Sequence, residues 1–432
     1  MCEGRTMSRG FPLVAIAVVI TLALLAGACT GDDGEGAAST TTTTSTERGN
    51  VDETLAIGQL ASVTGDLALL SPSFTKPVEL AVAEMNVAGG VNGAPVTLSV
   101  ADDASTQTTA DASLAKLVDT DKVDVVIGPS SSNVALAQLE QVAQARVLEC
   151  AGSNTALALS LADSDGYYFR TTPSDRLQSR ALAQLLTQDG RKQPGFLVRD
   201  DAYGLGLARA TARALRRGGA TPKPIVAYDP AGAGLAADAA RVAESGPDAV
   251  VVIGFPEDGA KALAALNSVG INPTTLPTYG TDAMESTRLA GLVDPANPAI
   301  IAGMKGTTPA AVPAGVGSPF DAVIATSGVN NVFSSYYYDC AILSALAAVK
   351  AGTDDPVALK RAFSKNLEGK TECNTFAACK AALEAGRSIH YRGASSRFDD
   401  WAGFEPGHGA YDVWSYDTTG KPVTAPRLQI AV

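Results

Sequence analysis

The chain has 432 residues, of which 46% are hydrophobic and 18% are charged, and its net charge at neutral pH is −12. This length favours two domains, each able to bury a sizeable core, over one. The negative charge is spread thinly along the chain, so we do not expect binding to nucleic acid or to an anionic membrane through a basic surface.

Residues 1–28 have the order of a bacterial export signal. Arg5 and Arg9 come first, an apolar run from Phe11 to Ala28 follows, and the polar segment TGDDGEG comes soon after it. A positively charged start, an apolar centre and small residues before a cleavage site are the three parts of a signal peptide. We therefore expect the mature protein to function outside the cytoplasm.

The stretch LLAGAC at 24–29 is similar to the lipobox of bacterial lipoproteins, in which the cysteine is acylated and becomes the mature N-terminus. Leu25 lies one position further from Cys29 than is usual, and Ala-Gly-Ala at 26–28 also fits ordinary signal cleavage, so both outcomes remain open. Residues 29–53 lack an apolar run that could offset the entropy of ordering a chain. They are predicted to be a lipid-anchored flexible linker.

From Thr54 onward, short β-branched runs alternate with longer alanine-rich amphipathic runs, which is typical of βαβ units. The predicted strands are apolar on both faces, as in a parallel sheet that helices cover on both sides. The rhythm restarts after YYFRTTPSD at 167–175, so we predict an α/β fold with two doubly wound parallel-sheet lobes. The predicted strands lie within residues 54–62, 94–104, 123–132 and 146–156 in the first half, and within 194–201, 223–230, 248–255 and 276–282 in the second.

In the second half, helices are predicted to begin near Gly204, Leu235, Glu257 and Met284. Near the C-terminus, SSRFDD at 395–400 and GAYDVWSYD at 409–417 are predicted to be strands. In the second of these, Trp414 and Tyr416 share one face and are expected to pack rather than to bind a ligand.

The residues that an enzyme would need are missing at the strand ends. Ligands of doubly wound sheets bind beyond the carboxyl ends of the strands. The two histidines, His390 and His408, both lie in the irregular C-terminal region, far in sequence from those ends. The loop that starts at Gly128 lacks the second glycine of a G-x-S-x-G elbow and the lysine of a phosphate-binding loop. We expect no enzyme activity and neither a cofactor nor a metal.

The loop GPSSSN at 128–133 connects a predicted strand to a predicted helix. Serine hydroxyls and backbone N–H groups at a helix N-terminus form a receptor for a carboxylate. The alternative is that Ser132 only caps the helix, as serine commonly does.

Two neighbours favour ligand binding. A second small polar loop, AGSNTA at 151–156, follows the adjacent strand, and Asp282 ends a strand of the other lobe. Carboxylate-binding groups on one wall and an acid on the other suit a zwitterion such as an α-amino acid, because a buried ammonium needs a charged partner. The alternative for Asp282 is that it caps the helix predicted near Met284.

Cys150, Cys340, Cys373 and Cys379 remain once Cys2 and Cys29 are set aside. An even number of cysteines outside the cytoplasm favours disulfides. Cys373 and Cys379 are the most favourable pair if Cys373 lies just before a helix that starts near residue 374 or 375. Cys150 and Cys340 form the second pair, or remain two separate buried thiols.

Seven stretches from Thr54 onward form an ordered set of motifs. They are AVAEMNVAGGVNG (81–93), VVIGPSSS (125–132), YYFRTTPSDRLQ (167–178), RDDAYGLGLA (199–208), YDPAGAG (228–234), GPDAVVVIGF (246–255) and YYYDCAILSALAAV (336–349). In these motifs, their order and their spacing, nearly the whole mature chain resembles the substrate-binding proteins of branched-chain amino acid ABC transporters, the leucine/isoleucine/valine-binding family with the periplasmic binding protein type I fold. An insert near 373, CNTFAAC, resembles that of actinobacterial members.

The resemblance implies a set of ligand-binding residues in both lobes. On the first lobe, Ser132 and Thr155 would contact the ligand through their side chains, and Ser153 through its backbone. On the second lobe, Tyr203 and Phe255 would close on the ligand, and Asp282 would take its ammonium group. Asp175 would lie near the hinge in a structural role, and Leu70 stands where the family commonly has an aromatic residue.

The resemblance also implies a three-crossing hinge, with crossings near Thr172, Thr307 and Ser395. Residues 54–172 plus 308–395 would form lobe 1, and residues 173–306 plus 396–432 would form lobe 2. The implied function is extracytoplasmic capture of an amino acid, branched-chain or related, for ABC permease subunits with two cytoplasmic ATPases. A sensor lipoprotein of the same fold, or a binder of an amide, urea or an aromatic carboxylate, remains open.

Overall fold

The computed structural model describes residues 52, 54–311, 320, 322, 324, 329 and 331–430 of the chain. The predicted signal peptide, Cys29 and all of the linker but Asp52 lie outside these residues. Among the helices of the described part, none combines the length and the apolar character that a membrane crossing requires.

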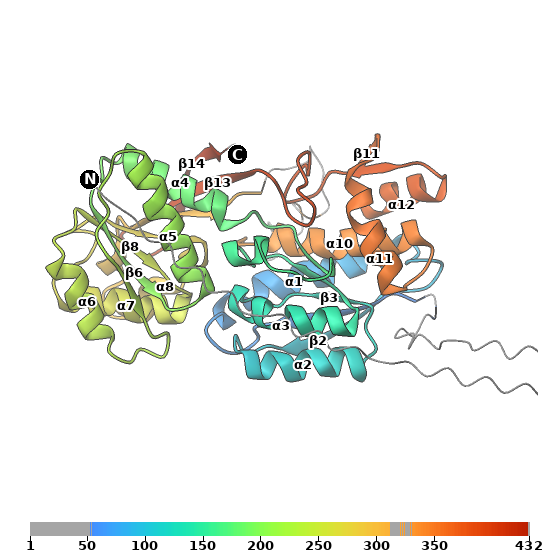
Figure 1. Ribbon diagram of the computed structural model, residues 1–432, viewed down its shortest axis with the longest axis horizontal. Helices are drawn as coiled ribbons and strands as arrows, with labels where there is room; N and C mark the ends of the chain where they lie inside the picture. The colour runs from blue at the N-terminus through green and yellow to red at the C-terminus, as the bar shows by residue number, and fades with distance from the viewer. Residues whose placement is uncertain are drawn as a thin grey trace, which may run out of the picture. The chain divides into compact units, whose positions relative to one another are not determined.

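The first sheet has five strands, all parallel, in the order β2-β1-β3-β4-β5. Its strands are β1 (Ala56–Ala61), β2 (Thr97–Asp102), β3 (Val125–Ile127), β4 (Leu148–Ala151) and β5 (Tyr168–Arg170). The helices α1 (Ser71–Val87) and α10 (Ser334–Ala351) cover one face, and α2 (Gln107–Asp119) and α3 (Ser132–Ala145) cover the other (Figure 1). Helices on both faces explain why β3 and β4 are apolar throughout or nearly so.

The second sheet has seven strands in the order β14-β13-β10-β9-β8-β6-β7. Strands β6 to β10 are parallel, whereas β13 is antiparallel to both β10 and β14. The strands are β6 (Pro194–Arg199), β7 (Ile225–Tyr228), β8 (Ala249–Ile253), β9 (Thr278–Gly280), β10 (Lys305–Pro309), β13 (Gly409–Tyr416) and β14 (Pro422–Ile430). On one face lie α4 (Asp175–Gln188) and α5 (Ala202–Arg217); on the other lie α6 (Leu235–Glu244), α7 (Pro256–Ser268) and α8 (Leu289–Val293).

Smaller elements complete the described chain. Strands β11 (Thr371–Cys373) and β12 (Ile389–Tyr391) form a two-stranded parallel sheet. The helix α11 (Pro356–Phe363) precedes β11 in the chain, and α12 (Phe376–Glu384) connects β11 to β12. The 3₁₀ helices are η1 (Ala68–Leu70), η2 (Leu157–Ser160), η3 (Asp282–Met284), η4 (Pro298–Ile301) and η5 (Ser364–Leu367).

The prediction of two α/β lobes built on largely parallel sheets is confirmed. The predicted packing role of Trp414 is confirmed as well, because this side chain is fully buried in the core of the second sheet. The boundaries of the two lobes stay a prediction. Strand β10 continues to Pro309 and still pairs with β13 there, two residues past the crossing expected near Thr307.

The strand predicted at 395–400 is wrong. The backbone N–H of Ser395 donates to Asp339 Oδ2 at 2.7 Å, so a side chain uses the donor that a strand would offer to its neighbour. Phe398 has φ +52, which lies in the left-handed region and is incompatible with an extended strand.

The helix predicted to begin near Met284 is also wrong. Residues 282–284 form a single 3₁₀ turn, and α8 begins only at Leu289. The hydroxyl of Tyr416 donates to the Met284 carbonyl at 2.7 Å and accepts from the Ser286 N–H at 3.0 Å. Because Tyr416 occupies these two backbone groups, a continuous helix cannot use them.

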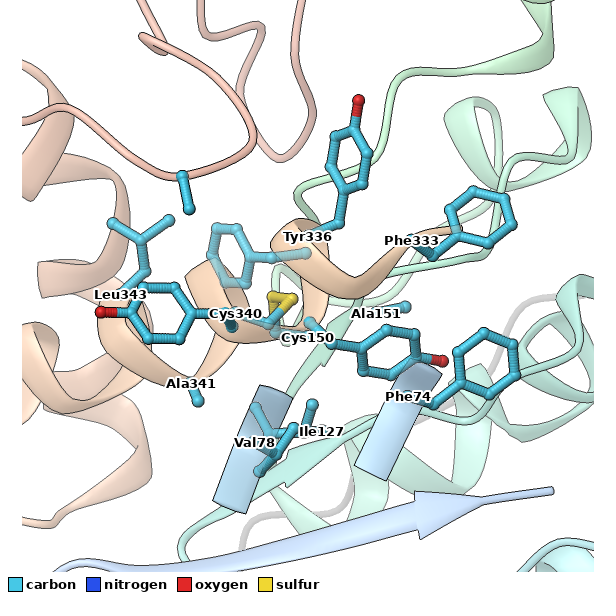
Figure 2. Close-up of a cluster of buried hydrophobic side chains, with 14 of the residues drawn as sticks. Phe74, Val78, Ile127, Cys150, Ala151, Phe333, Tyr336, Cys340, Ala341 and Leu343 are labelled. Atoms are coloured by element: carbon cyan, nitrogen blue, oxygen red, sulfur yellow. A yellow bond between two sulfur atoms is a disulfide. The ribbon is translucent and has the colours of Figure 1, made fainter. Parts of the chain in front are cut away.

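Both predicted disulfides are present. Cys150 of β4 is bonded to Cys340 of α10, which lies 190 residues later in the chain (Figure 2). The alternative of two separate thiols is therefore wrong. Cys373 is bonded to Cys379, and α12 starts directly after Thr375, whose hydroxyl accepts from the Ala378 N–H at 3.2 Å. This helix start agrees with the one that the cysteine spacing requires.

Candidate functional site

A cavity lies among the loops that follow strands of both sheets. It holds about 300 Å³ of empty space, counted with the solvent at its mouth. All six residues predicted as ligand contacts line it: Ser132, Ser153, Thr155, Tyr203, Phe255 and Asp282. The structure thus brings together residues that are up to 150 positions apart in sequence, and their role as ligand contacts stays a prediction.

Ser132 is the first residue of α3 and does not cap it. The capping position belongs to Ser131, whose side chain makes no capping hydrogen bond. The hydroxyl of Ser132 instead accepts a hydrogen bond from the Ala156 N–H at 3.2 Å, so it ties the loop after β3 to the loop after β4. This hydroxyl still has a proton to donate toward the cavity.

Ser130 lines the cavity too and is held from behind by a buried acid. Asp103 accepts from the Ser130 N–H at 3.1 Å and from the Ser62 hydroxyl at 2.5 Å. Burial raises the pKa of Asp103, and the hydrogen bonds from Ser62, Ser105 and Ser130 oppose that rise. The Ser62 N–H in turn donates to the Ser130 hydroxyl at 3.1 Å. These contacts fix both the backbone and the side chain of Ser130 within its loop.

Ser153 uses its side chain to hold its own loop. Its hydroxyl donates to the Ser130 carbonyl at 2.8 Å and lies 2.8 Å from the hydroxyl of Tyr337 in α10. A Cβ on Gly152 would lie 2.6 Å from a ring carbon of Tyr337, so only glycine lets this helix approach so closely. These contacts agree with the expectation that Ser153 offers the ligand its backbone.

Arg170 braces the loop that carries Thr155. It is fully buried, and it donates to the carbonyls of Asn154 at 2.8 Å and Ala156 at 3.0 Å. Its other nitrogens bind Glu405, with Nε at 2.8 Å from the carboxylate. Charge-assisted hydrogen bonds of this kind are roughly twice as strong as neutral ones. The backbone around Thr155 is therefore fixed by a residue that sequence reasoning did not select.

Tyr203 and Asp282 meet on the second lobe. The Tyr203 hydroxyl donates to Asp282 Oδ1 and lies 2.8 Å from the hydroxyl of Thr281. The Ala283 N–H donates to the same carboxylate oxygen at 2.9 Å. Because no helix begins at Met284, the alternative that Asp282 caps such a helix is wrong.

Asp282 lies almost completely buried at the cavity wall. Burial raises its pKa to about 6, although the hydrogen bonds from Tyr203 and from the Ala283 N–H lower it. No cation pairs with Asp282 among the ion pairs of the described residues. A buried carboxylate in this state favours a cationic partner, because pairing offsets part of the cost of removing the charge from water.

Asp175 is buried close to this pair. Burial, followed by the charge of Asp282, raises the pKa of its carboxyl well above the ordinary value, and a hydrogen bond from the Thr155 side chain lowers it. It does not line the cavity, which is consistent with the structural role expected from the resemblance.

Phe255 packs against the guanidinium group of Arg199. The guanidinium carbon of Arg199 lies 3.7 Å from the Phe255 ring centroid, a cation–π contact. Asp258 accepts from Arg199 at 2.7 Å and from the Phe255 N–H at 3.0 Å, so one acid positions both residues. Arg199 also contacts Asp201 at 2.6 Å and, from the first lobe, Asp66 at 3.6 Å.

The apolar part of the cavity was largely missed from the sequence. It is lined by Leu67, Leu70, Phe74 and Phe333, next to Tyr203 and Phe255. The sequence marks Leu70 only as a departure from the family. Phe333 has φ +64, a left-handed conformation that is an outlier for a bulky residue and is typical of functional sites. No sequence signal marks Phe333, because it stands alone before α10 without any pattern.

The model of the periplasmic binding protein family matches residues 54–390, which is well over half of the chain. The chain belongs to the periplasmic binding protein family. This periplasmic binding protein is therefore a solute-binding protein and not an enzyme, and its family is extracytoplasmic.

Two relatives illustrate the range of this family. A substrate-binding protein of a chemotactic signal transduction system from Halobacterium salinarum is 27% identical over 373 residues, covering 82% of this chain and 85% of the relative. A Leu/Ile/Val-binding protein homolog from Brucella melitensis is 26% identical over 238 residues, covering 55% of this chain and 64% of the relative. The second match thus spans less than two thirds of the Brucella protein.

Solved structures similar to this periplasmic binding protein share its fold at low sequence identity. The leucine binding protein LivK from Thermotoga maritima has a TM-score of 0.71 at 17% identity, covering 87% of this chain and 99% of that chain. LivJ from Streptococcus pneumoniae, in complex with isoleucine, has a TM-score of 0.67 at 20% identity, covering 87% of this chain and 99% of that chain. A solute binding protein from R. palustris, in complex with 4-hydroxybenzoate, has a TM-score of 0.67 at 17% identity, covering 88% of this chain and 98% of that chain. The type I fold of this family is therefore established for this chain.

Proposed function

We propose that this protein captures an α-amino acid, branched-chain or related, between its two lobes and delivers it to the permease subunits of an ABC importer. The observation that carries the proposal is the charge arrangement of the cavity. Hydroxyl groups of Ser132 and Thr155 stand on the first lobe, and the buried carboxyl of Asp282 stands on the second. A zwitterion satisfies both sides at once, because its carboxylate accepts hydrogen bonds and its ammonium pairs with the acid.

The apolar lining supports an apolar ligand side chain. Leu67, Leu70, Phe74 and Phe333 carry no polar side-chain atoms, so a polar side chain of the ligand would lose its contacts with water there. Two similar proteins support the same class, since one is a Leu/Ile/Val-binding protein homolog and the other is LivJ in complex with isoleucine.

Hinge closure would supply the contacts from the second lobe only after the ligand has bound to the first. A ligand shifts such an equilibrium only as far as its affinities for the open and closed states differ. In the proposed mechanism, Tyr203, Phe255 and Asp282 provide this difference, while Ser132, Ser153 and Thr155 bind in both states. The crossings near Thr172, Thr307 and Ser395 would bend.

The proposal is tested by a thermal-shift screen with L-amino acids, amides and small carboxylates. A ligand at 100 times its dissociation constant adds about 2.7 kcal/mol to the free energy of unfolding. We expect shifts with L-leucine and related amino acids. If every α-amino acid leaves the melting curve unchanged, the proposal is wrong.

A second candidate ligand is an aromatic carboxylate. It is favoured by the four aromatic side chains of the cavity and by the neighbouring structure that contains 4-hydroxybenzoate. The substitution Asp282→Asn separates the two classes. This substitution should severely weaken the binding of an amino acid, because the ammonium loses its charged partner. It should strengthen the binding of a ligand that carries only a carboxylate. Calorimetric titration of L-leucine and 4-hydroxybenzoate against both proteins measures the difference.

A sensor that reports occupancy to a signalling partner is a candidate for the downstream role, since one relative belongs to a chemotactic system. Uptake of radiolabelled L-leucine by cells that lack the protein distinguishes the two roles. Loss of uptake supports the importer, whereas normal uptake supports the sensor.

We also propose that Cys29 is acylated and anchors the protein to the outer face of the cell membrane. The stretch LLAGAC and the polar linker after it support this. Replacing Cys29 with alanine should release the protein into the soluble fraction; an unchanged distribution between membrane and soluble fractions would argue for ordinary signal cleavage.

A further inference from the structure

One ion pair joins the two lobes beside the cavity without lining it. Asp66 lies in the loop between β1 and α1, and Arg199 is the last residue of β6. The distance between Asp66 Oδ2 and the Arg199 guanidinium is 3.6 Å. Neither side chain lines the cavity, but the loop of Asp66 supplies Leu67 to it, and Arg199 packs on the cavity residue Phe255.

Arg199 is rigidly held within its own lobe. Its Nε contacts Asp201 at 2.6 Å, and one terminal nitrogen contacts Asp258 at 2.7 Å. Asp258 is fixed in turn by the Tyr228 hydroxyl at 2.5 Å and by the Phe255 N–H at 3.0 Å. The side chain of Arg199 is 7% exposed, so it loses little freedom when an acid of the other lobe approaches its remaining nitrogen.

Asp66, by contrast, is a surface residue with a side chain that is 38% exposed. In a state with separated lobes, its carboxylate would be hydrated and the second terminal nitrogen of Arg199 would face water. The contact thus forms only when the lobes approach. An interaction made in one state and absent from the other shifts the equilibrium toward the state that makes it.

We propose that Asp66 and Arg199 form a closure latch, which strengthens the binding of every ligand by the same factor and leaves the choice among ligands unchanged. Asp66 is a positioning residue, because it acts through the closed arrangement of the lobes and not through the ligand. Arg199 has a second effect, since it holds the Phe255 ring against the cavity. The affinity part of this inference rests on the proposed function, whereas the effect on lobe closure does not.

The test compares Asp66→Asn with a matched control, Asp200→Asn. Asp200 follows Arg199 directly and is exposed, and its side chain takes part in none of the ion pairs of the described residues. Both variants remove one negative charge from the same region, but only Asp66→Asn breaks the contact between the lobes. Arg199 itself is left intact, because its loss would leave Asp258 buried without its charged partner and endanger folding.

The first measurement is calorimetric titration of L-leucine and L-phenylalanine. We expect Asp66→Asn to lower the affinity for each probe that binds by about fivefold, which corresponds to the upper end of the free energies of exposed ion pairs. The loss should come from faster dissociation. Asp200→Asn should match the wild type. The difference between the wild type and Asp66→Asn should disappear near 1 M salt, where the Debye length falls to about 3 Å.

Three results would overturn the latch. They are an unchanged affinity in Asp66→Asn, an equal loss of affinity in Asp200→Asn, or a loss of affinity in Asp66→Asn that differs between two probes that bind. The last would mean that Asp66 acts on the ligand itself.

A second measurement needs no ligand and separates this inference from the proposed function. Small-angle X-ray scattering gives the radius of gyration of the ligand-free protein. We expect a larger radius for Asp66→Asn than for the wild type at low salt, and equal radii at high salt. If neither probe binds the wild type, the proposed function fails and the scattering alone decides the latch. Equal radii of gyration for the wild type and Asp66→Asn at low salt would refute the latch.

Discussion

The hydroxyl of Tyr203 donates a hydrogen bond to Oδ1 of Asp282, so an aromatic side chain and an acid of the second lobe form one unit in the cavity wall. The ring of Tyr203 stacks on Phe255, with 5.8 Å between centroids. The unit thus combines an apolar surface for the ligand with a carboxylate whose position is fixed from behind.

The substitution Tyr203→Phe should weaken amino acid binding without removing the apolar wall. Because the hydrogen bond from Tyr203 lowers the pKa of Asp282, its loss should raise that pKa further. The free energy of unfolding should fall by about 1 to 3 kcal/mol, the usual cost of a buried acceptor that loses its donor. Urea denaturation and calorimetric titration of L-leucine measure the two effects.

Tyr279→Phe is the matched control. The hydroxyl of Tyr279 donates to Asp189 at 2.7 Å, and Tyr279 does not line the cavity. This variant should be destabilised as well but should bind L-leucine like the wild type. Equal losses of affinity in the two variants would show that the Tyr203 hydroxyl has no special role in the site.

Amino acid binding should depend on pH through Asp282. Burial raises the pKa of this carboxyl to about 6, so it is ionised in most molecules at pH 8 and protonated in most at pH 5. Since the ammonium of the ligand needs the carboxylate form, affinity should fall as the pH drops below about 6, by up to about tenfold per pH unit. Calorimetric titrations of L-leucine between pH 5 and 8 measure this. The decline should be absent in Asp282→Asn; an identical decline there would assign the effect to another group.

Glu149 should make the protein less stable as the pH rises. Both of its carboxyl oxygens are buried in β4 without a hydrogen-bond partner among the described residues, and burial raises the pKa of this carboxyl well above 4.5. Above pH 4.5 the unfolded chain releases this proton and the folded protein retains it, so stability falls by about 1.4 kcal/mol per pH unit until the pH passes the raised pKa. The substitution Glu149→Gln should remove this decline and be more stable than the wild type at pH 8, as measured by urea denaturation.

Asp339→Asn provides the contrast to Glu149→Gln. Burial also raises the pKa of Asp339, to about 6. Its carboxylate, however, accepts from Tyr391 at 2.7 Å and from the N–H groups of Ala394 at 2.9 Å and Ser395 at 2.7 Å. An amide replaces one of these acceptors with a donor, so this variant should be destabilised at pH 8. Stabilisation of both variants, or of neither, would contradict the distinction between partnered and unpartnered buried acids.

The two disulfides should differ in their effect on stability. The Cys150–Cys340 bond closes a loop of 190 residues, and the Cys373–Cys379 bond closes a loop of six. In the chain-entropy model, the first contributes about 5 kcal/mol and the second about 2. Replacing each pair with alanines and measuring denaturation in urea tests the order; a larger loss from the short loop would contradict the model.

The sequence was sufficient for the parts of the fold that follow a periodic pattern. Parallel strands that helices cover are apolar on both faces, so β3 and β8 could be identified directly. The wrong predictions lie where side chains from distant elements form hydrogen bonds with the backbone groups that a helix or strand would use. Tyr416 ends the turn after Asp282, and Asp339 holds the segment at Ser395, and neither contact leaves a local signal.

The polar half of the cavity could be predicted because short polar loops follow the strand ends, and the resemblance then selected Ser153 and Thr155 within the second loop. The residues that support it could not. Arg170 lies inside a strand and Tyr337 inside a buried helix, where ordinary core packing is the prior expectation. Phe333 also lacks a pattern, since its position depends on one unusual backbone conformation.

The contacts of α10 determine when the candidate site can be complete. Tyr337 supports the loop of Ser153, Cys340 is bonded to β4, and Phe333 lines the cavity just before the helix starts. All three residues lie in the last quarter of the chain, far behind the serine loops in sequence. The first sheet alone would therefore present an incomplete site, which can form only after the chain has been made as far as α10 and this helix has packed on β4.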